Sequence, residues 1–339
     1  MSQDDLPGLD LVRLRGYLDE QSPGLVQGPL TGEVVQGGRS NLTYIVGDGT
    51  SRWVVRRPPL GHVLPTAHDM TREHRVISAL GDTAVPVPRT IALCQDSEVL
   101  GASFYVMEFV PGTPYRAARE LAALGPRRTK GIAESLLDTL VDLHAVDPGA
   151  VGLGDFGRPE GFLERQVRRW KKQLDASRSR DLPGIDDLHD QLAGAIPAAG
   201  PAAIVHGDYR LDNVLVDSGD RITAVLDWEM STLGDPLTDL ALLVAYAERD
   251  KVDLEVVSNV STAPGYPGTG EMIARYADRS GRDVSALDWY IGFAFFKLSV
   301  ILEGIYYRFS QGQTVGAGFD KIGATVLPLV TLGLETLKD

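Results

Sequence analysis

Three polar residues at the ends of short apolar runs have the types and spacing that phosphoryl transfer needs. Asp208 is followed five residues later by Asn213, and Asp227 ends a later apolar run, Ile222–Leu226. In such a transfer one carboxylate orients the attacking hydroxyl, while an amide and a second carboxylate hold Mg²⁺ on the nucleotide phosphates. The order therefore predicts Asp208 as the catalytic base and Asn213 and Asp227 as metal ligands.

The apolar runs around these residues are the elements that must position them. Ala202–Val205 and Val214–Val216 bracket the polar loop that holds Asp208, and Ile222–Leu226 leads to Asp227. Short apolar runs bounded by polar and glycine residues are typical of strands. We therefore expect strand, loop, strand, turn, strand, with the chemical groups at the strand ends.

Several motifs of this stretch occur in one fixed order. The sequence reads HGD at 206–208, Asn213, DWE at 227–229 and GDPLTDLA at 234–241. This order resembles the aminoglycoside phosphotransferase family, whose members have a protein-kinase-like fold. SNLTY at 40–44, together with the DWE and GDP motifs, is most similar to the branch related to the kinase domain fused to some acyl-CoA dehydrogenases. The resemblance implies an ATP- and Mg²⁺-dependent kinase.

A glycine-containing hairpin precedes the third expected strand. GGRSN at 37–41 lies between strands expected at Glu33–Val35 and Leu42–Val46. In the kinase plan such a tip covers the nucleotide phosphates, because glycine lets backbone N–H groups approach closely. The resemblance assigns cofactor binding to four residues of this tip: Gly38, Arg39, Ser40 and Asn41. The alternative is an ordinary hairpin with a glycine turn.

The third strand, WVVRR, departs from the kinase pattern because it carries arginine where kinases have lysine. Strand alternation places Arg56 and Arg57 on opposite faces, so only one can face the nucleotide, and we favour Arg56. Arginine can still bind phosphate, through two parallel hydrogen bonds. Glu73, on a helix expected at Asp69–Leu80 with Asp69 as its cap, matches the family's partner of this cation. Otherwise it is a solvated helix carboxylate.

The segment MEFVPG at 107–112 resembles the hinge between the two kinase lobes. The resemblance implies that the carbonyl of Glu108 and the N–H of Val110 bind the adenine edge. We therefore expect a bilobal α+β protein with a small antiparallel-sheet lobe over 1–107, a hinge over 108–112 and a larger, mainly helical lobe over 113–339.

Arg210 follows Asp208 by two residues, where protein kinases have a lysine that contacts the transferred phosphate. We predict that Arg210 stabilises the charge that develops there. A salt bridge from Arg210 to Asp212 is the open alternative. Asp239 is expected to cap the next helix and to bond back to the catalytic loop.

Composition limits the classes of function. The chain has 339 residues, 43% hydrophobic residues, one cysteine (Cys94) and a formal net charge of −13. The acidic balance argues against nucleic acid as the partner, and a single cysteine excludes a disulfide within the chain and fits the cytoplasm. No stretch reads as a signal peptide or membrane span, because the apolar run Trp289–Ile305 contains charged residues. Monomer and homodimer both remain open.

The acceptor is the least determined part of the prediction. The family name suggests an aminoglycoside, whereas the branch suggests a hydroxy acid or a hydroxyacyl thioester. Four acidic residues after the catalytic segment are candidate acceptor contacts: Asp250, Asp253, Glu255 and Glu271. We expect a small-molecule kinase that phosphorylates a hydroxyl. The alternative, kept because of the lysine-to-arginine change, is a nucleotide-binding pseudokinase or scaffold without turnover.

Overall fold

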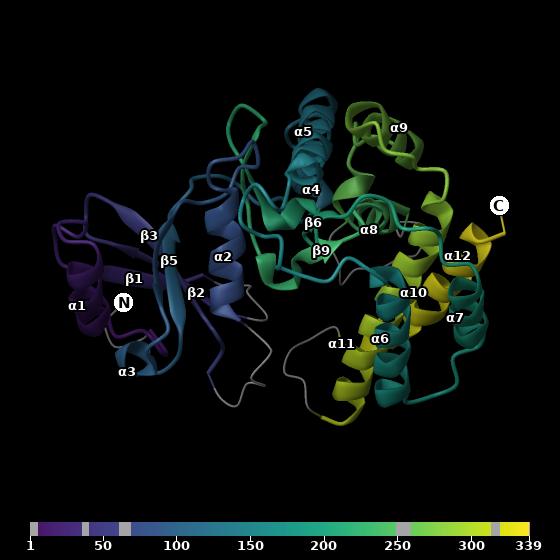
Figure 1. Ribbon diagram of the computed structural model, residues 1–339, viewed down its shortest axis with the longest axis horizontal. Coiled ribbons are helices and arrows are strands. Elements are labelled where there is room, and N and C mark those ends of the chain that lie inside the picture. The colour runs from purple at the N-terminus through teal and green to yellow at the C-terminus, as the bar shows by residue number, and fades with distance from the viewer. Residues whose placement is uncertain (1–5, 36–40, 61–68, 249–258, 313–318, 339) are drawn as a thin grey trace. The chain divides into compact units, whose positions relative to one another are not determined.

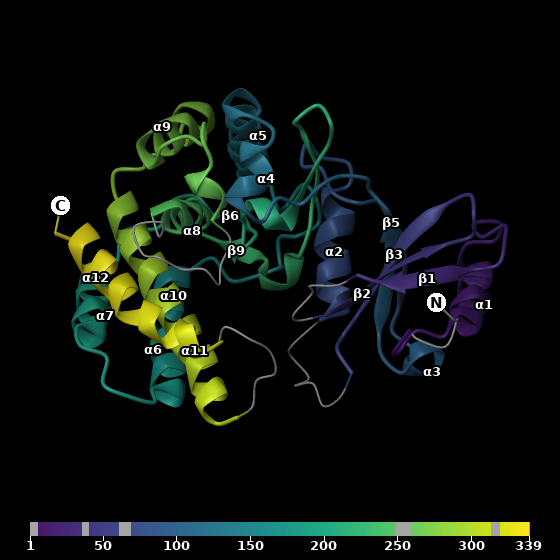
Figure 2. The ribbon, with the colours of Figure 1, turned by 180° about the vertical axis from the view of Figure 1, so that it is seen from behind.

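A computed structural model describes residues 6–35, 41–60, 69–248, 259–312 and 319–338. The chain forms two compact units (Figures 1 and 2). Unit 1 comprises Met1–Gly112 and Thr223–Ser231, and unit 2 comprises Thr113–Ile222 and Thr232–Asp339. The short segment Thr223–Ser231, which contains Asp227, therefore belongs to the N-terminal unit although it follows the catalytic loop in sequence.

Unit 1 is built on a five-stranded antiparallel sheet in the order β1-β2-β3-β5-β4. The strands are β1 (Thr31–Val34), β2 (Leu42–Gly47), β3 (Arg52–Arg57), β4 (Thr90–Cys94) and β5 (Phe104–Glu108). The turn between β2 and β3 is fixed by Asp48, whose carboxylate accepts hydrogen bonds from the amides of Thr50 and Ser51. The strands expected at Glu33–Val35, Leu42–Val46 and WVVRR are confirmed as β1, β2 and β3, to within about two residues at each end.

Helices cover both faces of this sheet. Helix α2 (Met70–Leu80) begins after Asp69, whose carboxylate accepts from the amide of Arg72, as the sequence predicts. Helices α1 (Leu11–Gln21) and α3 (Ser97–Leu100) lie on the other face (Figure 1). Helix α3 begins after Asp96, whose carboxylate accepts from the amide of Glu98.

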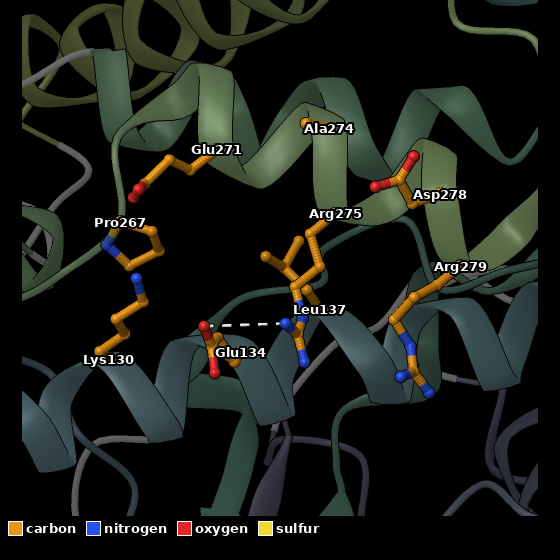
Figure 3. A pocket seen from close by; sticks show the side chains of 9 residues that line it. All are labelled: Lys130, Glu134, Leu137, Pro267, Glu271, Ala274, Arg275, Asp278 and Arg279. Carbon is orange, nitrogen blue, oxygen red and sulfur yellow. Dashed lines mark ion pairs between the residues drawn. The ribbon is translucent and has the colours of Figure 1, made fainter.

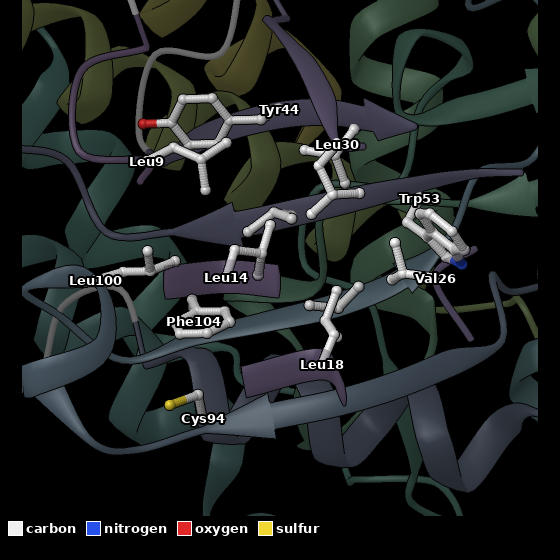
Figure 4. Close-up of a cluster of buried hydrophobic side chains, with 13 residues drawn as sticks. Leu9, Leu14, Leu18, Val26, Leu30, Tyr44, Trp53, Cys94, Leu100 and Phe104 are labelled. Atoms are coloured by element: carbon white, nitrogen blue, oxygen red, sulfur yellow. The ribbon is translucent and has the colours of Figure 1, made fainter. Parts of the chain in front are cut away.

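The core of unit 1 lies between the sheet and α1 (Figure 4). Leu14 and Leu18 of α1 pack there with alternate residues of the strands, among them Trp53 and Phe104. Because successive strand residues point to opposite faces, the residues between these core positions face α2 instead. This alternation decides which of the two adjacent arginines of β3 faces which side.

Unit 2 is mainly helical, which agrees with the α+β class expected. Its helices are α4 (Ala118–Ala122), α5 (Pro126–Ala145), α6 (Phe162–Ser177), α7 (Ile185–Gly194), α8 (Leu237–Glu248), α9 (Thr269–Ser280), α10 (Leu287–Ser310), α11 (Phe319–Ile322) and α12 (Val326–Thr336). Helix α10 packs against α6, α7, α8, α11 and α12. Its length and apolar composition would allow a membrane crossing, but 78% of its most apolar window is buried in the fold.

The catalytic segment is made of short elements. In unit 2, β6 (Ala203–Val205) pairs antiparallel with β9 (Thr232–Gly234), and the one-turn helix η1 (Leu211–Asn213) leads into β7 (Val214–Val216). The chain passes into unit 1 within β8 (Ile222–Val225), which is followed by η2 (Trp228–Met230). Two further one-turn helices are η4 (Val260–Thr262) and η5 (Gly323–Thr325).

Candidate functional site

A cluster of polar side chains lies on the α2 face of the sheet in unit 1. We call it the Arg56 cluster, and it comprises Asn41, Arg56, Glu73, Tyr105, Asp227 and Glu229. The neighbouring Arg57 points to the opposite face, where it is 4% exposed and donates to the carbonyl of Leu100 at 2.7 Å. The strand alternation therefore directs Arg56, and not Arg57, toward α2.

Arg56 links two carboxylates from distant parts of the sequence. Its Nε lies 3.1 Å from Oε2 of Glu73, and its Nη2 contacts Oδ1 of Asp227. The Glu73 side chain is 1% exposed, so it is not the solvated helix carboxylate of the alternative interpretation. Tyr105 donates its hydroxyl hydrogen to Glu73 at 3.0 Å, which fixes the orientation of this buried carboxyl group.

The cluster holds more negative than positive charge among the residues that the structure describes. Burial raises the pKa of Glu73 to about 7, and the nearby carboxylates of Asp227 and Glu229 add to this effect, while Arg56 opposes it. Burial alone would lower the pKa of Arg56, but Tyr105, Glu73 and Asp227 raise it. A further cation near these carboxylates would therefore be electrostatically favourable.

Two features of the cluster are costly unless a ligand or another group compensates for them. Asp227 adopts left-handed backbone angles, with φ of 66° and ψ of 60°, which is strained for a residue with a side chain. Asn41 donates to Glu73 at 3.1 Å and to Glu229 at 3.3 Å, yet its buried Oδ1 has no hydrogen-bond partner among the described residues. Glu229 also takes part in the cluster, because its carboxylate accepts this hydrogen bond from Asn41.

The other residues predicted to bind the nucleotide are those of the hairpin tip and of the hinge. Gly38, Arg39 and Ser40 lie outside the described residues. Glu108 ends β5 and donates its amide hydrogen to the carbonyl of Arg89 at 2.8 Å. Val110, two residues further on, is half-buried. The adenine contact of this segment stays a prediction.

The second group of predicted residues lies in the loop after β6, in unit 2. Asn213 donates from Nδ2 to the carboxylate and to the carbonyl of Asp208, both at 2.9 Å. The hydroxyl of Tyr246 donates to the other carboxylate oxygen of Asp208 at 3.3 Å. Because the Asn213 nitrogen is engaged with Asp208, its carbonyl oxygen is the atom suited to bind a metal ion.

Arg210 contacts both acidic residues of this loop. Its Nη2 lies 3.1 Å from Oδ2 of Asp212, and its Nε lies 3.4 Å from Oδ2 of Asp208. The salt bridge to Asp212 that was left open as an alternative is therefore present. Burial raises the pKa of Asp212, although Arg210 opposes the shift. The predicted contact of Arg210 with a transferred phosphate remains untested.

Asp239 holds the backbone of the catalytic loop. Its carboxylate accepts from the amides of His206 at 2.6 Å and Gly207 at 2.8 Å, and His144 Nε2 lies 3.3 Å away. Burial opposes its ionisation, but the hydrogen bonds and charge of His144 and His206 hold the pKa of Asp239 below its ordinary value. The expected bond back to the loop is present.

The expected helix-capping role of Asp239 was wrong, because this residue is the third residue of α8. Asp235 takes that place, since its carboxylate accepts from the amide of Leu237 at 3.0 Å. The chain thus uses one acidic residue for the helix end and the other for the loop.

Two residues that the sequence analysis did not select also support this loop. His144, on α5, receives a hydrogen bond at Nδ1 from the hydroxyl of Tyr276 at 2.8 Å if its Nε2 carries the hydrogen toward Asp239. Lys297, on α10, donates to the carbonyl of Gly207 at 3.0 Å. The one signal for Lys297 was a charge within a long apolar run.

An open pocket of about 410 Å³ lies between α5 and α9 (Figure 3). It contains Glu271, one of the candidate acceptor contacts, together with charged residues of both signs such as Lys130 and Arg275. Arg275 is bound to Asp138 at 2.8 Å and lies 3.7 Å from Glu134. The other candidate contacts, Asp250, Asp253 and Glu255, lie outside the described residues.

The donor atoms predicted for a metal are oxygens. A carboxylate of Asp227 and an amide carbonyl of Asn213 are hard ligands, which suit Mg²⁺ better than zinc. Within the described residues, no group of three or more His, Cys, Asp and Glu side chains could hold a metal ion. The oxygen chemistry of each of these two residues is therefore compatible with magnesium.

Comparison with known proteins agrees with this chemistry. Acyl-CoA dehydrogenase family member 11 of Rattus norvegicus is 34% identical over 335 residues, and the match covers 96% of this chain but 43% of the rat protein. The chain thus spans less than half the length of that relative. A candidate aminoglycoside phosphotransferase from Ralstonia eutropha has a crystal structure with a TM-score of 0.85 and 33% identity, covering 97% of this chain and 98% of the other.

A more distant structure shares the fold. A thermostable mutant of the aminoglycoside phosphotransferase APH(4)-Ia, in a ternary complex with AMP-PNP and hygromycin B, gives a TM-score of 0.60 at 16% identity. That match covers 95% of this chain and 98% of the other. The kinase-like α+β fold expected from the sequence is thereby confirmed. Because residues 31–276 also match the family's sequence pattern, this chain belongs to the phosphotransferase enzyme family.

Proposed function

We propose that the protein transfers the γ-phosphoryl group of ATP to a hydroxyl group of a small molecule. The observation that supports this most is the arrangement of Asp208, which is fixed by Asn213 and preceded by a backbone segment bound to Asp239. Phosphoryl transfer depends on positioning and charge neutralisation more than on covalent help from the protein. A rigidly held carboxylate is suited to orient the acceptor hydroxyl and to take its proton.

We propose that unit 1 binds the nucleotide through the Arg56 cluster. Arg56 would contact the phosphates, and Glu73 would hold its guanidinium in place. Asp227 and Asn213 would be the oxygen ligands of Mg²⁺, which neutralises phosphate charge when bound. The match of residues 31–276 to the phosphotransferase enzyme family supports a nucleotide as the phosphoryl donor.

For the acceptor, we propose a hydroxy acid or a hydroxyacyl thioester ahead of an aminoglycoside. The support comes from the name of the rat relative, which is an acyl-CoA dehydrogenase family member and 34% identical to this chain. The structural neighbour that binds hygromycin B shares 16% identity and so informs about the fold alone.

The test is ADP formation from MgATP in the presence of a panel of hydroxy acids, hydroxyacyl thioesters and aminoglycosides. Asp208→Ala should lower the rate by about 10²- to 10⁴-fold, the usual contribution of a general base. Asp181→Ala, which removes an exposed carboxylate, is the matched control and should leave the rate unchanged. Nucleotide binding without turnover of any acceptor would instead favour the scaffold.

A further inference from the structure

A single lysine lies in the middle of α10, a long and largely buried helix of unit 2. Lys297 lies in α10 between Phe296 and Leu298, which are 0% and 5% exposed. A charged group in such surroundings is costly unless it has a polar partner. Burial lowers the pKa of Lys297, while the negative charges of Asp208 and Asp239 oppose the shift. The ammonium group of Lys297 therefore needs a specific polar partner.

That contact is made with the catalytic loop. The ammonium group of Lys297 donates to the carbonyl oxygen of Gly207 at 3.0 Å, and it lies 5.7 Å from the centre of the Trp170 ring. Tyr290 lies two helical turns earlier on the same face of α10 and donates to the carboxylate of Asp235 at 2.8 Å. Helix α10 thus contacts the catalytic segment at two points, and Lys297 is the one next to Asp208.

The residue that Lys297 contacts has unusual backbone freedom. Gly207 has φ of 85°, a conformation that glycine adopts without strain. Without a side chain to restrict it, the peptide between Gly207 and Asp208 could rotate and move the carboxylate of Asp208. In the structure, Asp239 holds the N–H of Gly207 and Lys297 holds its carbonyl oxygen. Both polar groups of the residue before Asp208 are therefore fixed.

We propose that Lys297 is a positioning residue for phosphoryl transfer, which fixes the Gly207–Asp208 peptide and thereby the carboxylate of Asp208. This inference rests on the proposed function for its kinetic consequence, but its structural part does not. Charged groups near the ammonium are Asp208 and Asp239, which attract it, and Arg169 of α6, which repels it. The lysine acts on the reaction through the loop backbone, so its loss should change kcat more than nucleotide affinity.

The first experiment compares Lys297→Met with Lys172→Met, which removes an exposed lysine of α6. The probe is MgATP with water as the acceptor, and ADP formation is followed as a function of ATP concentration. Lys297→Met should lower kcat by about 10- to 100-fold, since misplacing a catalytic group by 1 Å can cost 10²-fold. The KM for ATP should change less than about twofold. An unchanged kcat, or an equal loss in Lys172→Met, would overturn the proposal.

Chemical rescue separates a specific ammonium from general packing. Lys297→Cys treated with 2-bromoethylamine regains a side chain that ends in an ammonium group, and the chain's one native cysteine, Cys94, is buried. We expect aminoethylation to restore most of the lost kcat, whereas alkylation with iodoacetamide should not. Equal recovery with both reagents, or with neither, contradicts the role assigned to the charge. Because this comparison does not use Lys297→Met, it still tests the role of the ammonium group if that variant fails to fold.

An activity-independent measurement separates this inference from the proposed function. Amide hydrogen exchange in the peptide covering residues 203–211 should be faster in Lys297→Met than in the wild type, while peptides from unit 1 exchange equally. If the wild type forms no ADP but exchange still accelerates, the proposed function fails and the positioning role stands. If exchange in this peptide is unchanged, the positioning role fails whatever the activity.

Discussion

The Arg56 cluster of unit 1 and the catalytic loop of unit 2 are held in different ways. In the cluster, side chains contact other side chains, and Arg56 is shared between Glu73 and Asp227. In the loop, backbone groups are bound by buried side chains, with Asp239 on the amides and Lys297 on a carbonyl. The first arrangement depends on the balance of charge, and the second depends on hydrogen-bond geometry.

This difference indicates which of the two regions is complete before a ligand binds. The loop has both polar backbone groups of Gly207 paired and Asp208 oriented, as preorganised catalysis requires, although Oδ1 of Asp212 has no hydrogen-bond partner among the described residues. The cluster has a strained Asp227, an unpaired amide oxygen on Asn41 and an excess of carboxylates. A bound cation would improve the electrostatics of the cluster but would change little in the backbone bonds of the loop.

The largest effect is expected when the loop loses its buried acceptor. Asp239→Asn turns one acceptor into a donor that faces the amides of His206 and Gly207, and it leaves His144 without its carboxylate partner. Breaking a buried, charged network of this kind costs about 3–5 kcal/mol in the free energy of unfolding. Denaturant unfolding measures this loss, and Asp278→Asn on the exposed side of α9 is the control. A loss as small as in the control would mean that the loop does not depend on Asp239.

The same comparison explains what could be predicted from the sequence. Local signals sufficed for the Asp69 cap of α2 and for the strand alternation that separates Arg56 from Arg57. The motif order predicted Asp208 and Asn213 as site residues, and in the structure the two side chains are hydrogen-bonded. These features depend on residues within a few positions of one another, so pattern and spacing carry the information.

Features that depend on distant contacts were not predicted. Lys297 contacts Gly207 of the loop across 90 residues of sequence. His144 contacts Asp239, which holds the loop, across 95 residues. No periodicity in the sequence reveals contacts at such separations. Helix α12 was not predicted, because its sequence, VLPLVTLGLET, is mostly apolar and offers few polar residues to mark a helical period. Asp239 was placed at the helix end because acidic residues prefer that position, but its bonds to the loop decide its location instead.

A smaller effect is expected in the cluster, where the free energy of unfolding should depend on pH. Its direction is opposite to that of a typical ion-paired carboxylate, which stabilises the fold as the pH rises. Because the pKa of Glu73 is raised from 4.5 to about 7, the folded protein keeps a proton that the unfolded chain releases between these values. Stability should therefore fall as the pH rises from about 4.5 to 7, by about 3 kcal/mol. Unfolding by denaturant across this range should show a slope that is weaker in Glu73→Gln. Glu20→Gln, an exposed change in α1, should keep the wild-type slope.

The smallest effect concerns the cation that the cluster would accommodate. If Asp227 is a ligand of Mg²⁺, adding MgCl₂ to the complex with AMP-PNP should raise the thermal midpoint, because a ligand that binds the folded state alone stabilises it by about 2.7 kcal/mol at 100 times its Kd. Asp227→Asn keeps the size of the side chain but removes a negative charge and the stronger oxygen ligand, so the magnesium-dependent part of the rise should shrink. Calorimetric scans with MgCl₂ and with EDTA measure that part alone, and Asp217→Asn, on a surface turn of unit 2, controls for a lost carboxylate. An equal magnesium effect in Asp227→Asn and the wild type would remove Asp227 from the metal site and leave the charge excess of the cluster without a functional explanation.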